Sequence, residues 1–296
     1  MDRRRRLLLN QWERRTDVAL AEAAQRCGLR IWGKVRLASA LAIDRSGLSS
    51  EEYTYALKAE FDFVVAVDDE LPVFAVEFDE PHHLTEPRTL KRDRLKGAIC
   101  DKLGLPLVRI GSEYLRRERR FTLIGYLVEV WALERAFDEA QERGTIPWDE
   151  PFIAENVISD SLGGTADWPY WLDRPARLAM VEAASAGQLR TRVPEQIITP
   201  WPSSDAADDE FVEAWAVLAL AGDGFILGQA RLRNFKVFIP GVTARSLAAS
   251  VSVADAGRRL KAVLAGEEPP ASLEDWMTLR ARTVGWTSQG GHIPVG

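Results

Sequence analysis

Residues 61–79 read FDFVVAVDDELPVFAVEFD, and this stretch decides the fold. It contains two runs rich in Val and Phe, Phe61–Val67 and Val73–Asp79, whose composition is typical of strands. The residues between them, Asp68–Pro72, are typical of a turn. The stretch therefore predicts a β-hairpin.

Acidic residues interrupt one side of this predicted hairpin. Successive side chains of a strand point to opposite faces, so the aromatic residues and their aliphatic neighbours form one apolar face. If the hairpin register unites those positions, Asp62, Glu77 and Asp79 share the other face. The alternative is that the three acids lie at solvated strand ends, where they need no special explanation.

Three carboxylates on one surface of two apolar strands are costly, because desolvation and mutual repulsion both oppose their ionisation. A bound divalent cation relieves both costs. Mg²⁺ is commonly held by one or two carboxylates while it keeps several waters and binds phosphate oxygens. Such an ion polarises a phosphodiester and lowers the pKa of an attacking water. The pattern therefore points to a metal, and Mg²⁺ in turn suggests a phosphate substrate.

The sequence around the hairpin predicts an α/β core with a mixed central sheet flanked by helices. Helices are expected over residues 10–28 and 89–103, and a helical stretch over 112–144 that is either continuous or broken near Arg120. Strands are expected over 30–37 and 106–110, and a loop over 44–52. The resulting order is α-β-β-β-α-β-α. We assign residues 1–143 to this first domain.

The amino-acid composition changes after Gly144, where Pro and Gly become frequent. Residues 144–173 are expected to form a linker or irregular connection. Residues 174–296 are expected to form a smaller α+β domain of unknown role. Its predicted elements are helices over 174–189 and 253–264, a hairpin over 214–220 and 225–232, and a strand over 236–239.

The charge is unevenly distributed along the 296 residues. The chain carries 38 Lys and Arg against 44 Asp and Glu, a net charge of −6. Residues 1–120 have a net charge of 23 − 20 = +3, and residues 121–296 have 15 − 24 = −9. A net negative charge argues against nucleic-acid binding, but the first segment of the chain is mildly basic. The acidic second segment could bind a protein partner.

Cysteine and histidine are scarce. Two cysteines and three histidines match no usual zinc spacing, so we do not expect structural zinc. So few cysteines favour a reducing compartment. The sequence has no stretch typical of a signal peptide or a membrane span, so we expect a cytoplasmic protein without membrane association.

Several short motifs follow one another in the first 115 residues. They are Asp62-Phe63-Val64-Val65, Val76-Glu77-Phe78-Asp79, His83, Arg92-Asp93, Lys96 and Gly104–Ile110. In their order and spacing they resemble the restriction-endonuclease-like, or PD-(D/E)xK, nuclease superfamily, and within it the bacterial branch related to the very-short-patch repair endonuclease. The resemblance covers residues 10–115 and implies a restriction-endonuclease-like core with metal-dependent nuclease activity.

The resemblance gives each strand acid a role. Asp62 would be the central metal ligand and Glu77 the second ligand. Asp79 stands where many members of the superfamily carry the lysine that orients the attacking water. It is therefore either a further ligand, in a Glu-x-Asp variant of the motif, or the mark of an impaired site.

The resemblance also implies a catalytic cation and a supporting acid. Lys96, on the predicted helix that follows, is our candidate for the cation, and Lys34 is a weaker one. Alternatively, Lys96 forms only a surface helix pair with Asp93. An acid on the first helix often supports the metal, and Asp17 fits the spacing best. Glu13 and Glu22 are the alternatives.

Two histidines follow the acidic strand directly. The family position falls on His83, which would transfer a proton or contact phosphate. The alternative is a solvated turn histidine, and this reading is stronger for His82.

Basic residues in the first domain would contact the DNA backbone. Contacts of this kind depend on salt and do not read sequence. The alternative is that the charge runs are solvated faces. The candidates are Lys34, Arg36, Arg92, Arg116 and Arg117.

Together with the acidic pattern, the resemblance implies a metal-dependent endonuclease that hydrolyses phosphodiester bonds in DNA, and the resemblance alone implies a role in defence or repair. Mg²⁺ or Mn²⁺ would be held by Asp62, Glu77, Asp79 and Asp17, with Lys96 and His83 as further catalytic residues. RNA is an alternative substrate. Two rival functions are a catalytically inactive nucleic-acid-binding module of the same fold and a protein-interaction module.

Overall fold

The chain folds into two compact units. The structure is a computed structural model that describes residues 10–67, 70–79, 87–154, 172–200, 210–291 and 293. Unit 1 comprises residues 1–152 and 235–240, and unit 2 comprises residues 153–234 and 241–296. Most of the expected linker, residues 155–171, lies outside the described residues. The sequence placed all of residues 174–296 in the second domain, whereas segment 235–240 belongs to unit 1.

Unit 1 is built on a mixed four-stranded sheet with the order β1-β2-β3-β4. The strands are β1 (Arg30–Arg36), β2 (Glu60–Ala66), β3 (Pro72–Phe78) and β4 (Leu107–Ile110). Strands β1, β2 and β3 pair antiparallel, and β4 pairs parallel to β3. The predicted hairpin is confirmed, because Phe63 pairs with Val76 and Val65 with Phe74.

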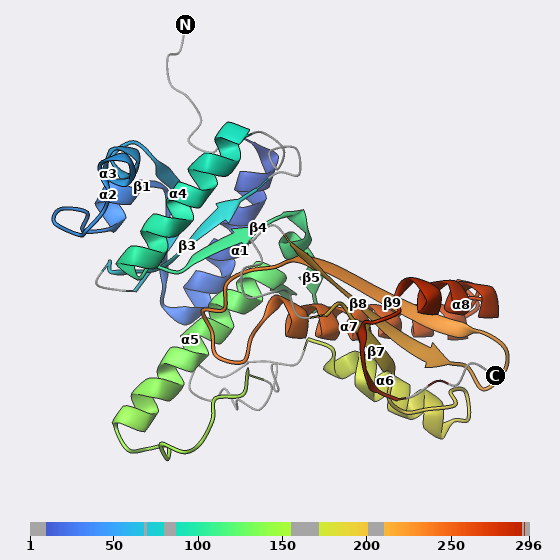
Figure 1. Cartoon of the computed structure of the whole chain (residues 1–296). Coiled ribbons are helices and arrows are strands. Elements are labelled where there is room, and N and C mark those ends of the chain that lie inside the picture. Colours follow the sequence, from blue (N-terminus) through green and yellow to red (C-terminus); the bar gives the residue numbers. More distant parts are fainter. Residues whose placement is uncertain are drawn as a thin grey trace, which may run out of the picture. The chain divides into compact units, whose positions relative to one another are not determined.

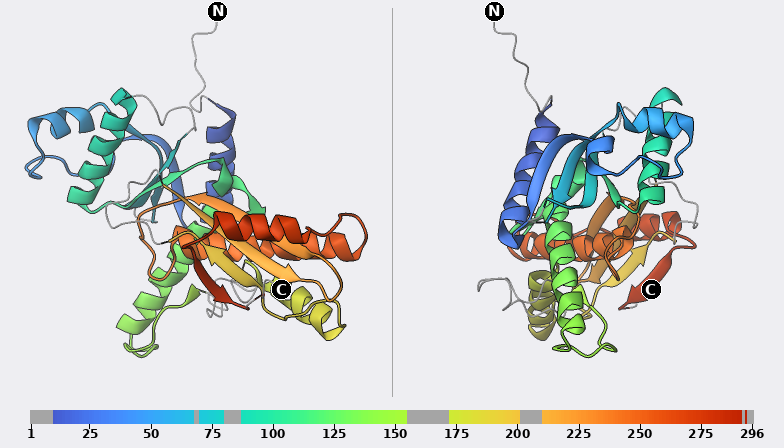
Figure 2. Two further views of the ribbon diagram at one scale, coloured as in Figure 1. Left: turned by 45° about the vertical axis from the view of Figure 1, so that its right-hand side comes forward. Right: turned by 90° about the vertical axis from the view of Figure 1, so that its left-hand side faces the viewer.

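Helices cover both faces of this sheet. In the right-hand view of Figure 2, α1 (Gln11–Cys27) and α4 (Pro87–Leu103) lie on opposite sides of the strands. Helix α5 (Leu123–Glu142) packs on α1. This arrangement confirms the helices expected over residues 10–28 and 89–103.

Two regions of unit 1 differ from expectation. Residues 112–122 do not begin a long helix but form a 3₁₀ turn, Ser112–Leu115, and the short strands β5 (Arg117–Glu118) and β6 (Phe121–Thr122). The expected loop is present over residues 44–49, between the short helix α2 (Leu37–Ala40) and helix α3, but residues 50–52 belong to α3 (Ser50–Ala56). Ser49 and Glu52 form a capping box that starts α3.

Segment 235–240, here called the strap, packs into unit 1. Its Phe238 ring lies 5.2 Å from Phe74 of β3, and Phe235 lies 6.2 Å from Tyr114, between ring centroids. Phe235 and Ile239 are 3% and 0% exposed. The strand predicted over residues 236–239 is wrong, since residues 236–238 have no regular secondary structure and Ile239 forms only an isolated bridge.

Unit 2 is an antiparallel sheet with helices on both faces, labelled in Figure 1. The strand order is β10-β7-β8-β9, and β8 and β9 form the predicted hairpin. Helices α6 and α7 pack on one face, and α8 packs on the other, in front of the sheet in the left view of Figure 2. The elements are α6 (Arg174–Ser185), β7 (Glu195–Ile198), β8 (Phe211–Ala219), β9 (Phe225–Arg233), α7 (Ala244–Leu264), α8 (Leu273–Arg282) and β10 (Thr287–Gly290).

The helices of the described part of the chain are all too short or too polar to cross a membrane.

Candidate functional site

The backbone ladder between β2 and β3 ends at the pair Phe63–Val76. Asp62 and Glu77 are the next residues on the two strands beyond this last pair. Beyond this pair, side chains replace the backbone carbonyls as acceptors. The Asp62 backbone N–H donates to Glu77 Oε1 at 3.2 Å, and the Phe78 backbone N–H donates to Asp62 Oδ2 at 3.0 Å. The two carboxylates therefore occupy adjacent positions where the backbone ladder ends.

Lys34 reaches Asp62 from the neighbouring strand. Gly33 and Val35 of β1 pair with β2, but the Lys34–Asp62 pair between them is missing. Lys34 has a φ of 56°, a left-handed conformation that costs a side chain of this kind about 1–2 kcal/mol. Its Nζ donates to Asp62 Oδ1 at 2.6 Å and to Glu13 Oε1 at 2.8 Å. Burial opposes the charge of Lys34, but the hydrogen bonds to both acids raise its pKa.

Glu77 and Lys96 form a buried ion pair. Each residue is 7% exposed, and Lys96 Nζ lies 2.7 Å from Glu77 Oε2. Lys96 also donates to the backbone carbonyl of Glu60 at 2.8 Å, so α4 is linked to both β2 and β3. Desolvation raises the pKa of Glu77 to about 7, although Lys96 opposes this effect.

Asp79 lies with a different cation. Its Oδ2 is 3.2 Å from Arg109 NH1, and the same guanidinium contacts Asp93 Oδ1 at 3.2 Å. Arg109 is 4% exposed, and these two acids together outweigh burial and raise its pKa. The three strand acids thus separate into the adjacent Asp62 and Glu77 and an Asp79 bonded to Arg109.

A protein cation, as well as a bound metal, can therefore offset the charge of each strand acid, because each of the three has a Lys or Arg partner. Within the described ranges, no three His, Cys, Asp or Glu side chains form a group that could hold a metal ion. The predicted ligand set of Asp62, Glu77, Asp79 and Asp17 is therefore not assembled.

Ion pairs link the three strand acids to further charged side chains. In the ion pairs described above, three cations connect five acids. The cations are Lys34, Lys96 and Arg109, and the acids are Glu13, Asp62, Glu77, Asp79 and Asp93.

Helix α1 contributes Glu13 rather than Asp17 to this cluster. Glu13 is 7% exposed and shares Lys34 with Asp62. Asp17 is half-buried and has no hydrogen bond or ion pair to another residue that the structure describes. Glu22 binds Arg117 instead. The sequence could not predict which of these three acids joins the cluster, because helical spacing shows which residues share a face but not which of them Lys34 contacts.

His82 and His83 lie outside the described residues, so their predicted roles stay predictions.

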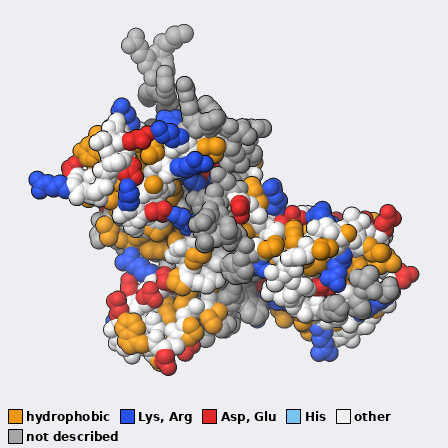
Figure 3. All heavy atoms as spheres, viewed as in Figure 1, with side chains coloured by type: hydrophobic (Ala, Val, Ile, Leu, Met, Phe, Trp, Pro, Cys, Tyr) orange, Lys and Arg blue, Asp and Glu red, His pale blue; other side chains and the backbone are white. Residues whose placement is uncertain are grey.

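The predicted DNA-contacting cations differ in their surroundings. Arg116 lies 2.7 Å from the buried acid Glu118, and Arg117 lies 2.9 Å from an acid of α1. Arg36 is mostly exposed, with an acid at 3.8 Å, and Arg92 of α4 is exposed without an ion pair in the described ranges. Figure 3 shows Lys and Arg side chains on unit 1 intermixed with Asp and Glu. Arg92 is therefore the better-placed cation for phosphate, and Arg116 and Arg117 serve local ion pairs.

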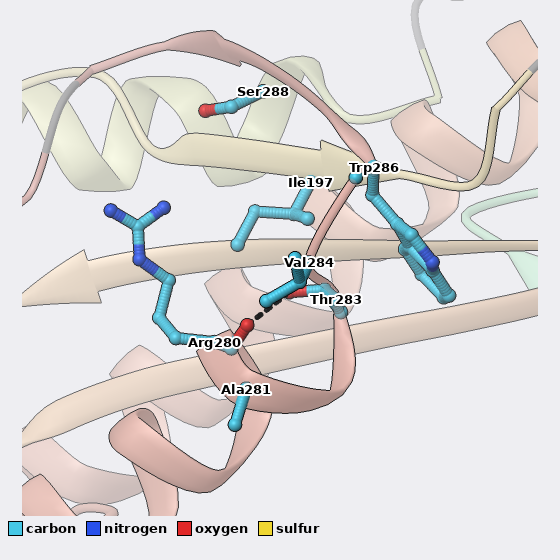
Figure 4. Close-up of a pocket in the computed structure, with 8 residues that line it drawn as sticks. Ile197, Arg280, Ala281, Thr283, Val284, Trp286 and Ser288 are labelled. Carbon is cyan, nitrogen blue, oxygen red and sulfur yellow. Dashed lines mark hydrogen bonds between the residues drawn. The ribbon is translucent and has the colours of Figure 1, made fainter.

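A cavity of about 410 Å³ lies in unit 2 and contains no predicted site residue. Figure 4 shows Arg280 at one end, Trp286 at the other and Ile197 between them. Arg280 binds the fully buried Glu195 at 3.0 Å, so its charge is already paired. The site of interest is therefore the cluster around Asp62.

Sequence reasoning assigned no role to two residues near this cluster. Arg109 pairs in register with Glu77, and its presence in the otherwise apolar strand β4 was a usable signal. Tyr55 of α3 is half-buried, and burial together with the charges of Glu77 and Asp93 raises its pKa to about 12. Its approach depends on α3, which was expected to be a loop in part.

Comparisons with known proteins cover only the first part of the chain. No curated protein and no solved structure matches the sequence. A family model described as a protein of unknown function, DUF2726, matches residues 5–123, which include all four strands of the unit 1 sheet.

Proposed function

We propose that this protein is a metal-dependent endonuclease that hydrolyses phosphodiester bonds in DNA at the cluster around Asp62 and Glu77. One observation carries the proposal: two adjacent carboxylates, Asp62 and Glu77, lie where a sheet ladder ends, and Asp62 and Phe78 of the two strands donate their backbone N–H groups to them. A divalent cation bound at both carboxylates would offset their mutual repulsion.

The donor set suits Mg²⁺ or Mn²⁺, which one or two carboxylates hold while water fills the other positions. Asp62 and Glu77 would be the ligands, and the ion would polarise the phosphodiester and lower the pKa of a bound water. Asp79 is a weaker candidate for a third ligand, because Arg109 joins its carboxylate to Asp93 of α4, whereas Asp62 and Glu77 are adjacent at the end of the ladder. Glu13 is a better supporting acid than Asp17, since it shares Lys34 with Asp62.

Lys96 is the proposed catalytic cation. Its ammonium group is next to Glu77, and it would stabilise the charge that develops on the phosphate. Arg92, exposed on the same helix, would bind the DNA backbone. His83 remains the candidate for proton transfer.

A binding module without catalysis is the second candidate. It is favoured by the same ion pairs, since each strand acid already has a protein cation and Asp79 replaces the lysine of the resembling superfamily. Such a module would bind nucleic acid without cutting it.

The test is incubation of the full chain with plasmid and single-stranded DNA, with Mg²⁺ or Mn²⁺. The variants are Asp62→Asn and Glu77→Gln, and the control is Glu70→Gln, an exposed acid at the turn of the same hairpin. We expect cleavage by the wild type and the control, and a loss of about 100-fold or more in both site variants. Cleavage that persists in both variants would reject this site, and DNA binding without cleavage under any condition would favour the binding module.

A further inference from the structure

Arg109 is a buried cation that joins the end of strand β3 to helix α4. Its guanidinium contacts the carboxylate of Asp79 at 3.2 Å and the carboxylate of Asp93 at 3.2 Å. It also donates to the Asp93 backbone carbonyl at 3.1 Å. One side chain thus binds both the side chain and the backbone of α4.

The position of Arg109 in the sheet places this clamp beside Glu77. Arg109 of β4 pairs in register with Glu77 of β3. On α4, Asp93 precedes Lys96 by three residues, so both side chains lie on the same side of the helix. The helix is therefore clamped one turn before the residue that binds Glu77.

We propose that Arg109 is a positioning residue, which holds α4 against the sheet so that the Lys96 ammonium group stays at the Glu77 carboxylate. This inference rests on the proposed function, in which Lys96 acts on the phosphate. It also gives Asp79 a role, because the carboxylate of Asp79 orients the guanidinium.

Arginine suits this task better than lysine. A planar guanidinium presents five donors and can bind two carboxylates and a carbonyl at fixed angles. A lysine has a single ammonium group on a flexible stem, so it would restore the charge but not all three contacts. The substitution Arg109→Lys should therefore rescue only part of the positioning.

The test measures the reactivity of individual lysines in the folded full chain, by acetylation followed by mass spectrometry. In the wild type, Lys96 should react much more slowly than the exposed Lys91, because its side chain is 8% exposed and paired. In Arg109→Gln, we expect Lys96 to react about tenfold faster, the factor for one lost charged hydrogen bond. Arg109→Lys should give an intermediate rate.

Glu52→Gln is the matched control, because it breaks an ion pair of the same helix, Glu52–Lys102 at 2.7 Å. It should increase the reactivity of Lys102 and leave Lys96 protected. If Arg109→Gln does not fold, as judged by circular dichroism, Asp93→Asn replaces it, and it should also expose Lys96 but not Lys102.

An unchanged Lys96 in a folded Arg109→Gln or Asp93→Asn variant would overturn the proposal and reduce Arg109 to a local ion pair. The labelling result does not depend on nuclease activity. Exposure of Lys96 in a protein that never cleaves DNA would support the positioning role and reject the proposed function. If the wild type cleaves DNA but the reactivity of Lys96 is unchanged in these variants, the proposed function would be supported and the positioning role rejected.

Discussion

Phe235→Ala should destabilise unit 1, although residue 235 lies between strands and helices of unit 2 in the sequence. The ring is 3% exposed, and its centroid lies 6.2 Å from Tyr114 and 6.0 Å from Phe238. Truncation of a buried Phe to Ala costs about 3–5 kcal/mol, and each lost aromatic pair accounts for about 0.5–1.5 kcal/mol of it. Against a typical unfolding free energy of about 5–15 kcal/mol, this is a large fraction.

Hydrogen exchange of the full chain, followed by mass spectrometry, locates the loss. Peptides from β3 and the 3₁₀ turn at Ser112–Leu115 should lose protection in Phe235→Ala. The control is Val237→Ala in the same strap, where the side chain is 58% exposed and the change should stay within about 0.5 kcal/mol. Equal behaviour of the two variants, or loss of protection confined to unit 2, would refute the assignment of the strap to unit 1.

Three further predictions follow from buried or exposed groups. In the wild type, the unfolding free energy should fall as the pH rises from about 5 to about 7. The reason is that burial raises the pKa of Glu77 to about 7 in the folded protein, whereas the carboxyl of the unfolded chain loses its proton near pH 4.5. Denaturant titrations at several pH values should show a smaller pH dependence in Glu77→Gln. Gly228→Ala should lower the melting temperature of unit 2, because the new Cβ would lie 2.3 Å from backbone atoms of Ser252 and Ala256. The control is Gly222→Ala, where no atom lies within 4 Å of the new Cβ. Equal melting temperatures of the two variants would contradict the close packing of β9 on α7. Replacing the exposed residues Arg92 and Arg94 with Gln should weaken DNA binding and reduce its salt dependence by about two phosphate contacts, as measured by fluorescence anisotropy at several salt concentrations. Arg117→Gln should have little effect, because Arg117 is paired with Glu22. A larger loss of binding in Arg117→Gln than in the double variant would contradict this prediction.

The parts of the fold that the sequence predicted best have strong local patterns. The hairpin was predicted from two runs rich in Val and Phe around a turn, and the observed pairing of Phe63 with Val76 is the register that places the aromatic residues of both strands on one face. The helix that starts at Gln11 has an Asn10 cap and a Gly28 stop. These signals lie within a few residues of the elements they define.

The elements that were missed depend on distant contacts or on weak local signals. The strap has the apolar composition of a strand, and only its burial against Phe74 and Tyr114 distinguishes it. Residues 112–122 contain enough helix-forming residues to suggest a helix, but Arg119 adopts a φ of 58° between two short strands. Tertiary packing decided both cases.

The candidate site was predicted in part for the same reason. The adjacency of Asp62 and Glu77 follows from strand alternation and register. The left-handed φ of Lys34, which accompanies its contact with Asp62, has no signal in the sequence beyond the preceding Gly33. The choice among three acids of α1 likewise depends on which one Lys34 reaches.

Calorimetric titration of the full chain with Mn²⁺ tests the central claim most directly, because it does not require the right DNA substrate. We predict one binding site in the wild type and in Glu70→Gln, and its loss in Asp62→Asn and Glu77→Gln. Binding that survives in both site variants, or no binding to the folded wild type, would contradict the proposal that these two carboxylates hold a divalent cation.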